Sequence, residues 1–205
     1  WRSFTQWLGG MGIIVLTAAL LPLFGVGGLQ LLNAEAPGPT FERLVPRLQE
    51  TAKLLWGVYV LLSAGEAVLL MAGGMPPFEA VLQALATMAT GGFSPKNASV
   101  AAYSSPYLQW VIIVFMGLAG TSFSLHYFAL RRGSVSTYWK DTEFRFFLAM
   151  IVLATAVTTL VILWRAPEGV ERAIRDAAFQ VVAIITTTGF VTADFEHWPI
   201  LLQTL

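Results

Sequence analysis

One short segment occurs twice in this chain, at an interval of 97 residues. Each copy is an apolar stretch that leads into a turn rich in Thr and Gly. The copies read ATMATGGFS over residues 86–94 and AIITTTGFV over residues 183–191. At this interval six identities align: Ala80, Gln83, Ala86, Thr90, Gly92 and Phe93 fall on Ala177, Gln180, Ala183, Thr187, Gly189 and Phe190. Such self-similarity indicates a fold built by duplication of one unit.

The composition places most of the chain in an apolar environment. Hydrophobic residues make up 56% of the sequence and charged residues 12%, whereas a soluble domain carries about 25% charged residues. A chain of 205 residues cannot bury this much apolar surface in its own core, but a lipid bilayer can. The net charge of zero gives no electrostatic argument for nucleic-acid binding. The absence of cysteine excludes disulfides and thiolate metal sites.

Several apolar stretches have the length of about 20 residues that a helix needs to cross a membrane. We expect such spans at residues 4–24, 53–73, 107–130 and 146–164, with a fifth that begins at Trp198. Two other apolar stretches, at 78–89 and about 174–185, are too short to cross. They suit half-helices that enter the membrane and stop at the Thr/Gly turns. The sequence starts at a Trp next to the first apolar stretch and stops at a Leu inside the last one, so we interpret it as an internal segment of a longer protein.

The connections between these stretches are polar, and part of the first, residues 41–50, has the pattern of an interfacial helix. Lys and Arg residues set the expected orientation. One side has seven of them (Arg43, Arg47, Lys53, Arg131, Arg132, Lys140 and Arg145) and the other side four (Lys96, Arg165, Arg172 and Arg175). The first side is therefore expected to be cytoplasmic, so that both turns open outward.

Glu66 lies inside the second predicted span. An ionisable residue there is a candidate functional residue. Because Gly73 and Gly74 follow about two turns later, we expect Glu66 near the outer end of the helix, within reach of water.

The two Thr/Gly turns have the chemistry of a cation site. Non-helical backbone at membrane depth is tolerated where it is buried in protein or lines a wet cavity. Glycine permits the backbone angles that turn several carbonyl groups toward one axis, and such carbonyls can replace the hydration shell of a monovalent cation. The carboxyl end of a half-helix, with its partial negative charge, faces the same place. The sequence therefore predicts a cation pore.

These motifs resemble the Trk/Ktr/HKT superfamily of potassium transporters, most closely the membrane subunits of bacterial Trk systems. The resemblance rests on QWLGGMG at 6–12, AEAPGP at 34–39 and the two turns. It implies an all-α polytopic membrane protein with four helix–pore-helix–helix repeats around one pore. Residues 1–50 would then hold the last helix of the first repeat and a cytoplasmic connection, 51–132 the complete second repeat, and 133–205 the third repeat, truncated in its second helix.

The resemblance also implies the function and the site. The function would be potassium uptake across the bacterial inner membrane, without enzymatic activity and with K⁺ as the transported ion rather than a cofactor. The expected partners are the lipid bilayer, a second copy in a homodimer and a cytosolic nucleotide-binding regulatory subunit. The filter carbonyls would come from Thr90, Gly91, Gly92, Thr187, Thr188 and Gly189, flanked by Ala89, Phe93, Thr186 and Phe190. Channel-like transport and coupling to H⁺ or Na⁺ both stay open.

Other classes of membrane protein fit less well. A secondary transporter of another class also has broken helices and internal repeats, but those repeats are often inverted, whereas two full spans between the present copies give them one orientation. An intramembrane enzyme lacks support, because the sequence has no His-Glu-x-x-His motif and places His126 and His197 far apart. A purely structural subunit would not need the Thr/Gly turns.

Overall fold

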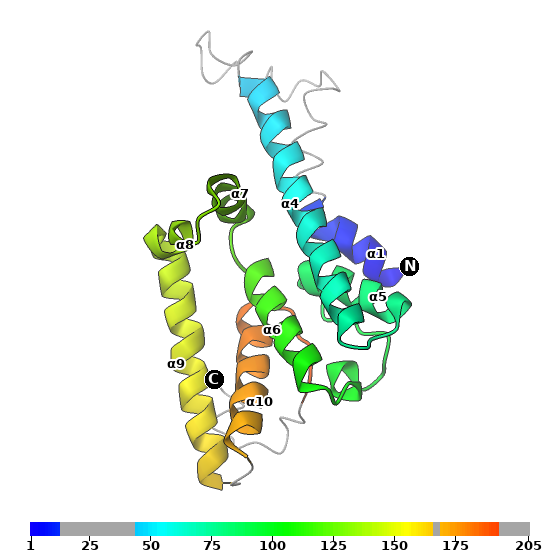
Figure 1. Ribbon diagram of the computed structural model, residues 1–205, viewed down its shortest axis with the longest axis vertical. Helices are drawn as coiled ribbons and strands as arrows, with labels where there is room; N and C mark the ends of the chain where they lie inside the picture. Colours follow the sequence, from blue (N-terminus) through cyan, green and yellow to red (C-terminus); the bar gives the residue numbers. More distant parts are fainter. Residues whose placement is uncertain (13–43, 166–168, 193–205) are drawn as a thin grey trace, which may run out of the picture.

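The computed structural model describes residues 1–12, 44–165 and 169–192. These residues form helices joined by turns, and none of them is in a β-strand. The elements in chain order are α1 (Arg2–Trp7), the π-helical turn η1 (Leu8–Gly12), α4 (Leu44–Ala72), α5 (Pro77–Met88), the 3₁₀ turn η3 (Ser99–Ala102), α6 (Pro106–Ala119), α7 (Phe123–Arg132), α8 (Ser136–Lys140), α9 (Thr142–Arg165) and α10 (Val170–Ile185) (Figure 1).

Two helices of the described residues are long and apolar enough to cross a membrane, namely Lys53–Ala72 within α4 and Thr142–Trp164 within α9. They correspond to the second and fourth predicted spans. The half-helix predicted at 78–89 is α5, displaced by one residue. Of the first predicted span, only α1 and η1 are described, and Gly10 interrupts them with a non-helical ψ of −120°. The fifth predicted span lies outside the described residues.

The third predicted span, residues 107–130, is not one continuous helix. α6 and α7 meet at an angle of 102°. The Leu118 carbonyl accepts hydrogen bonds from the Thr121 hydroxyl, at 2.8 Å, and from His126 Nε2, at 2.9 Å. Together with the Thr121 N–H, which donates at 3.1 Å, these side chains satisfy the Leu118 carbonyl at the point where α6 ends. His126 is 2% exposed, so it packs inside the protein at this bend.

Several element boundaries differ from those predicted, for local reasons. α10 begins at Val170 rather than near residue 174, because Gly169 is its N-cap and Glu171 pairs with Arg175 one turn later. α9 begins at Thr142, where the Asp141 carboxylate accepts a hydrogen bond from the Phe144 N–H at 2.7 Å. The interfacial helix expected at 41–50 is instead continuous with α4 from Leu44 onward.

The expectation that Glu66 reaches water is also wrong. Its exposed fraction is 0%, because α4 packs against α5 along the part of the helix that carries this residue. The short distance along the sequence to Gly73 therefore does not bring the carboxyl group to the surface.

The two short helices α5 and α10 pack on either side of α6. They share one core with it, whose largest buried side chains are Leu70, Ile112, Met116, Phe179 and Phe190. α1 and α4 cover α5, while α9 covers α10 (Figure 1). The carboxyl ends of α5 and α10, where the repeated turns begin, are thereby held around one packed centre.

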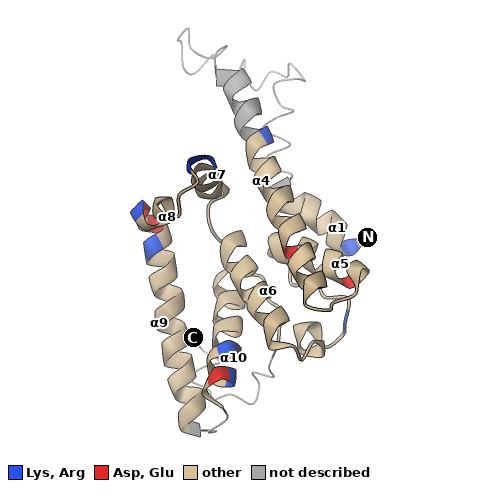
Figure 2. Ribbon diagram, in the orientation of Figure 1, with Lys and Arg blue, Asp and Glu red and all other residues tan. Residues whose placement is uncertain are grey.

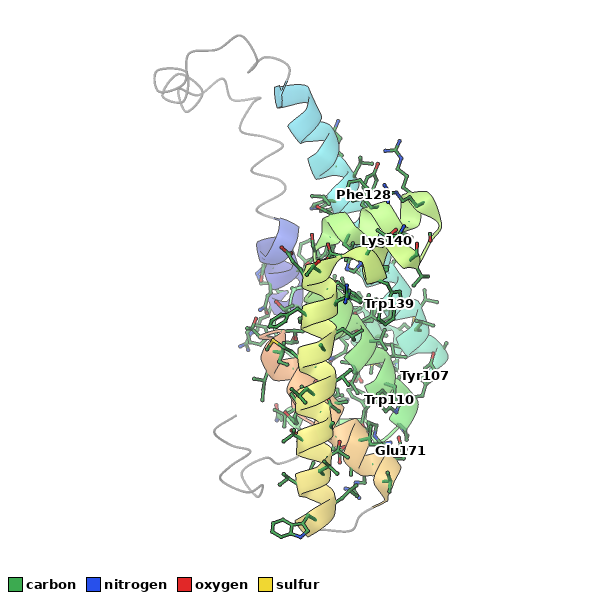
Figure 3. All side chains as sticks on the ribbon, turned by 90° about the vertical axis from the view of Figure 1, so that its left-hand side faces the viewer. Tyr107, Trp110, Phe128, Trp139, Lys140 and Glu171 are labelled. Atoms are coloured by element: carbon green, nitrogen blue, oxygen red, sulfur yellow. The ribbon has the colours of Figure 1, made fainter. Side chains whose placement is uncertain are left out.

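Charged and aromatic residues are arranged as a bilayer requires. Most of the described charges lie near helix ends, with Glu66 inside α4 as an exception, and Figure 2 shows none on α6 or along the middle of α9. In Figure 3, Trp139 and Lys140 lie toward one end of the molecule, and Tyr107 and Trp110 lie toward the other. Aromatic side chains at both ends of an apolar band are typical of the two membrane–water interfaces.

Candidate functional site

Both short helices end in the same backbone turn. We refer to residues 89–93 as the first turn and to residues 186–190 as the second turn. Thr90 and Thr187 have positive φ values of 49° and 58°, and their N–H groups donate to the carbonyls of Thr87 and Ile184, each at 2.9 Å. This is the usual left-handed end of a helix, in which glycine is the common residue. A β-branched residue there costs about 1–3 kcal/mol, so the repeat extends from sequence to a strained conformation.

Glycine follows two residues later in both turns, again with positive φ, at 68° for Gly92 and 75° for Gly189. The carbonyl oxygens beyond the last helical turn have no partner within the helix. Within the described part of the chain, no hydrogen bond is accepted by the backbone oxygens of Thr90, Gly91, Gly92, Thr187, Thr188 or Gly189. These oxygens are therefore available to a ligand that prefers oxygen donors.

The two turns meet at Gly92. A Cβ atom built on Gly92 would overlap the carbonyl oxygen of Thr188 and would lie 3.3 Å from the carbonyl carbon of Gly189. Next to this contact, the Ala101 N–H donates to the Val191 carbonyl at 3.0 Å. Segments almost 100 residues apart in the sequence are thus in backbone contact at the predicted site residues.

The first turn rests on α1. Gly91 lies against the side chain of Gln6, and the Arg2 guanidinium lies 3.7 Å from the centroid of the Phe93 ring. Ala89 lies behind Gly10, where an added Cβ would come within 3.3 Å of the Ala89 Cα. The place of Arg2 and Gln6 at the site could not be predicted, because no spacing rule connects them with a turn more than 80 residues away in the sequence.

The second turn is held by its own hydroxyl groups. Thr186 Oγ1 donates to the Val182 carbonyl at 2.7 Å and lies 2.8 Å from Thr188 Oγ1. Thr186, Thr188 and Phe190 are buried, with Phe190 only 1% exposed. Thr187 and Gly189, the two residues with positive φ, are exposed. The second turn therefore presents both of its residues with positive φ at the surface of this chain.

The amino end of α10 is tied to α6. Glu171 accepts from Arg175 at 2.7 Å and from the Trp110 indole N–H at 3.3 Å, and Trp110 and Glu171 lie near one another in Figure 3. Arg175 is buried at 8% exposure. The pair therefore fixes the far end of the helix that carries the second turn.

The amino end of α5 carries a second polar clamp. Glu79 binds Lys96 at 2.6 Å and accepts a hydrogen bond from the Tyr103 hydroxyl at 2.7 Å. The hydrogen bonds from Lys96 and Tyr103 lower the pKa of the Glu79 carboxyl below its ordinary value of 4.5. The clamp closes the loop after the first turn back onto the start of α5.

This clamp predicts a pH dependence. A carboxyl with a lowered pKa stabilises the folded protein at every pH above its ordinary value, and the stabilisation disappears as the pH falls through the lowered pKa. We expect Glu79→Gln to lower the Tm of the detergent-solubilised full-length protein slightly and by a constant amount between pH 7 and pH 5. Below about pH 4 the difference from wild type should shrink. A difference that grows on acidification would contradict the ion pair.

Comparison with known proteins identifies the family. The family described as TrkH, cation transport protein, matches residues 1–205. The chain belongs to the TrkH family. It is 42% identical to the Trk system potassium uptake protein TrkH of Salmonella typhimurium, over all of the chain and 43% of that protein. It is also 33% identical to the Trk system potassium uptake protein TrkG of Escherichia coli, over 97% of the chain and 41% of that protein.

A solved TrkH structure has the same fold. The crystal structure of the potassium transporter TrkH from Vibrio parahaemolyticus matches with a TM-score of 0.80 at 38% identity, covering 99% of this chain and 41% of that one. The chain thus spans less than half the length of these TrkH relatives. The resemblance drawn from the sequence is confirmed, and the chain is part of an all-α, multi-pass protein of the inner membrane.

Proposed function

We propose that this chain is part of a potassium uptake protein in which K⁺ crosses the membrane through a pore lined by the first and second turns. The contact of Gly92 with the Thr188 carbonyl carries the proposal, because it joins the two repeated turns at their glycines. The names of the TrkH and TrkG relatives, which are potassium uptake proteins, supply the ion.

The proposed mechanism is replacement of the hydration shell of K⁺. Carbonyl oxygens of residues 90–92 and 187–189 take the place of water, and no covalent chemistry takes place. The carboxyl ends of α5 and α10 add partial negative charge at the same location. α5 and α10 act as pore helices of successive repeats, with boundaries at residues 51 and 133. Two more filter segments come from parts of the protein beyond this chain.

We also propose two protein partners. The full-length protein forms a homodimer, and a cytosolic nucleotide-binding subunit regulates it. The docking surface for this subunit is the cytoplasmic side formed by the connections 25–50 and 131–145, the second of which contains Arg131, Arg132 and α8. The lysine and arginine count of these connections supports their cytoplasmic position.

Growth of a bacterium that lacks its own potassium uptake tests the proposed function. We expect the full-length protein, with any regulatory subunit supplied, to restore growth at low external K⁺. Gly189→Ser should abolish this rescue or make the cells sensitive to Na⁺, because Ser at a φ of 75° distorts the second turn.

Gly169→Ser is a matched control on the same helix. Gly169 is the N-cap of α10 and has open space around its Cβ position, and serine is a favoured N-cap residue. Growth with this variant should equal that of wild type. Failure of wild-type protein in the membrane to restore growth would instead favour a transporter of another class.

A further inference from the structure

Glu66 is a buried acid that the proposed pore does not use directly. Its side chain is 0% exposed, and no described residue donates to either carboxyl oxygen in regular hydrogen-bond geometry. A buried polar group without a partner is costly, particularly at membrane depth. Its retention in the middle of α4 therefore points to a role.

The Glu66 carboxyl faces the hydroxyl of Thr87 on α5. Thr87 is itself 0% exposed, and its carbonyl accepts the 2.9 Å hydrogen bond from the N–H of Thr90 that closes the first turn. Thr87 therefore connects the buried acid, Glu66, with Thr90, the strained residue of the first turn. A shift of Thr87 would move the carbonyl groups at residues 90–92 with it.

Hydrogen bonding indicates which form of Glu66 fits this environment. The single hydroxyl proton of Thr87 is donated to the Gln83 carbonyl at 2.9 Å, so Thr87 has no proton left for a carboxylate. A neutral Glu66 can instead donate its own proton to Thr87 Oγ1. Among the described residues, the buried side chains that can carry a positive charge, Arg175 and His126, are bonded elsewhere.

The second repeat lacks this arrangement. At the interval of 97 residues, Glu66 corresponds to Leu163 and Thr87 to Ile184, which is 64% exposed. The second turn uses the Thr186 and Thr188 hydroxyls instead. The acid therefore serves the first turn only, and the two turns are braced by different chemistry.

We propose that Glu66, as the neutral acid, is a positioning residue that holds α5 and the first turn in the geometry that selects K⁺ over Na⁺. This inference rests on the proposed function of the turns as an ion filter. It rests on the contact of the Glu66 carboxyl on α4 with Thr87, the residue whose carbonyl closes the first turn.

Ion flux through the purified full-length protein in liposomes tests the proposal. We expect Glu66→Gln, a neutral donor of nearly the same shape, to keep the wild-type ratio of K⁺ to Na⁺ uptake within about twofold. Glu66→Ala should lower that ratio by about tenfold, the size of effect seen when the supporting partners of ion ligands are removed. Val68→Ala is the matched control, because Val68 is on the same helix and 59% exposed. It should leave the ratio unchanged.

Thr87→Val provides an independent arm that keeps the volume of the side chain and removes the hydroxyl. It should lower the ratio as Glu66→Ala does, and combining Glu66→Ala with Thr87→Val should add little, as expected for two partners in one interaction. If Glu66→Ala does not accumulate in the membrane, Thr87→Val decides alone.

An unchanged ratio in Glu66→Ala or in Thr87→Val would overturn the inference. So would an equal loss in Glu66→Gln and Glu66→Ala, because the charge would then be required. Absence of K⁺ flux in the wild type is a different result, and it would overturn the proposed function itself.

Discussion

Gly92→Ala is expected to reduce K⁺ uptake by the full-length protein by about tenfold or more. A side chain at the φ of 68° costs about 1–2 kcal/mol. The larger effect is steric, because the new Cβ would overlap the backbone oxygen of Thr188. Backbone cannot rotate away as a side chain can, so the two turns must separate. Flux of K⁺ and Na⁺ into liposomes measures the result.

Gly74→Ala separates these two causes. Gly74 has a φ of 89°, also in the left-handed region, but nothing lies within 4 Å of its Cβ position. It should therefore show the cost of strain without the clash, and K⁺ uptake should stay close to wild type. Gly189→Ala should lie between them, since Gly189 has a φ of 75° and an open Cβ position within the described chain. Equal losses in Gly92→Ala and Gly74→Ala would argue against contact between the turns.

Gly10→Leu should destabilise the protein by about 1–3 kcal/mol, as overpacking does, and should also impair uptake. A Cβ at Gly10 would lie 3.2 Å from the Tyr59 hydroxyl and 3.3 Å from the Ala89 Cα. A leucine side chain would push α1 away from the first turn and break the 3.1 Å hydrogen bond from Tyr59 to the Trp7 carbonyl. Thermal unfolding and K⁺ flux report the two effects.

Gly9→Leu is the control for this variant. The neighbouring Gly9 has nothing within 4 Å of its Cβ position, and leucine is a better helix former than glycine. Its stability and uptake should match those of wild type or exceed them slightly. If Gly9→Leu and Gly10→Leu were equally harmful, close packing of α1 on the turn would not be the cause.

The repeat made the central part of this fold predictable. It placed α5 within one residue of its observed position, because a mostly apolar stretch of 12 residues that ends in a Thr/Gly turn is too short to cross a bilayer. It also aligned Gly92 with Gly189, and the family resemblance added Thr188 to the expected site residues. Gly92 contacts both Thr188 and Gly189. Identity between two copies is evidence within a single sequence that both perform the same task.

Long-range contacts account for what the sequence did not reveal. The bend at residues 120–122 depends on the hydrogen bond from His126 to the Leu118 carbonyl. It also depends on close packing at Gly120, where an added Cβ would lie 2.7 Å from the methyl carbon of Thr186. The burial of Glu66 depends on which face of α4 meets α5. Distance along the sequence carries neither piece of information, whereas span length and turn chemistry are local properties.

The most direct test of the central claim is to locate the ion. Crystals of the full-length protein grown with Rb⁺ in place of K⁺ would show the ion by its anomalous scattering. We expect a peak within coordination distance of the carbonyl oxygens of residues 90–92 and 187–189. A bound Rb⁺ ion elsewhere in the protein, with no peak at these two turns, would contradict the account.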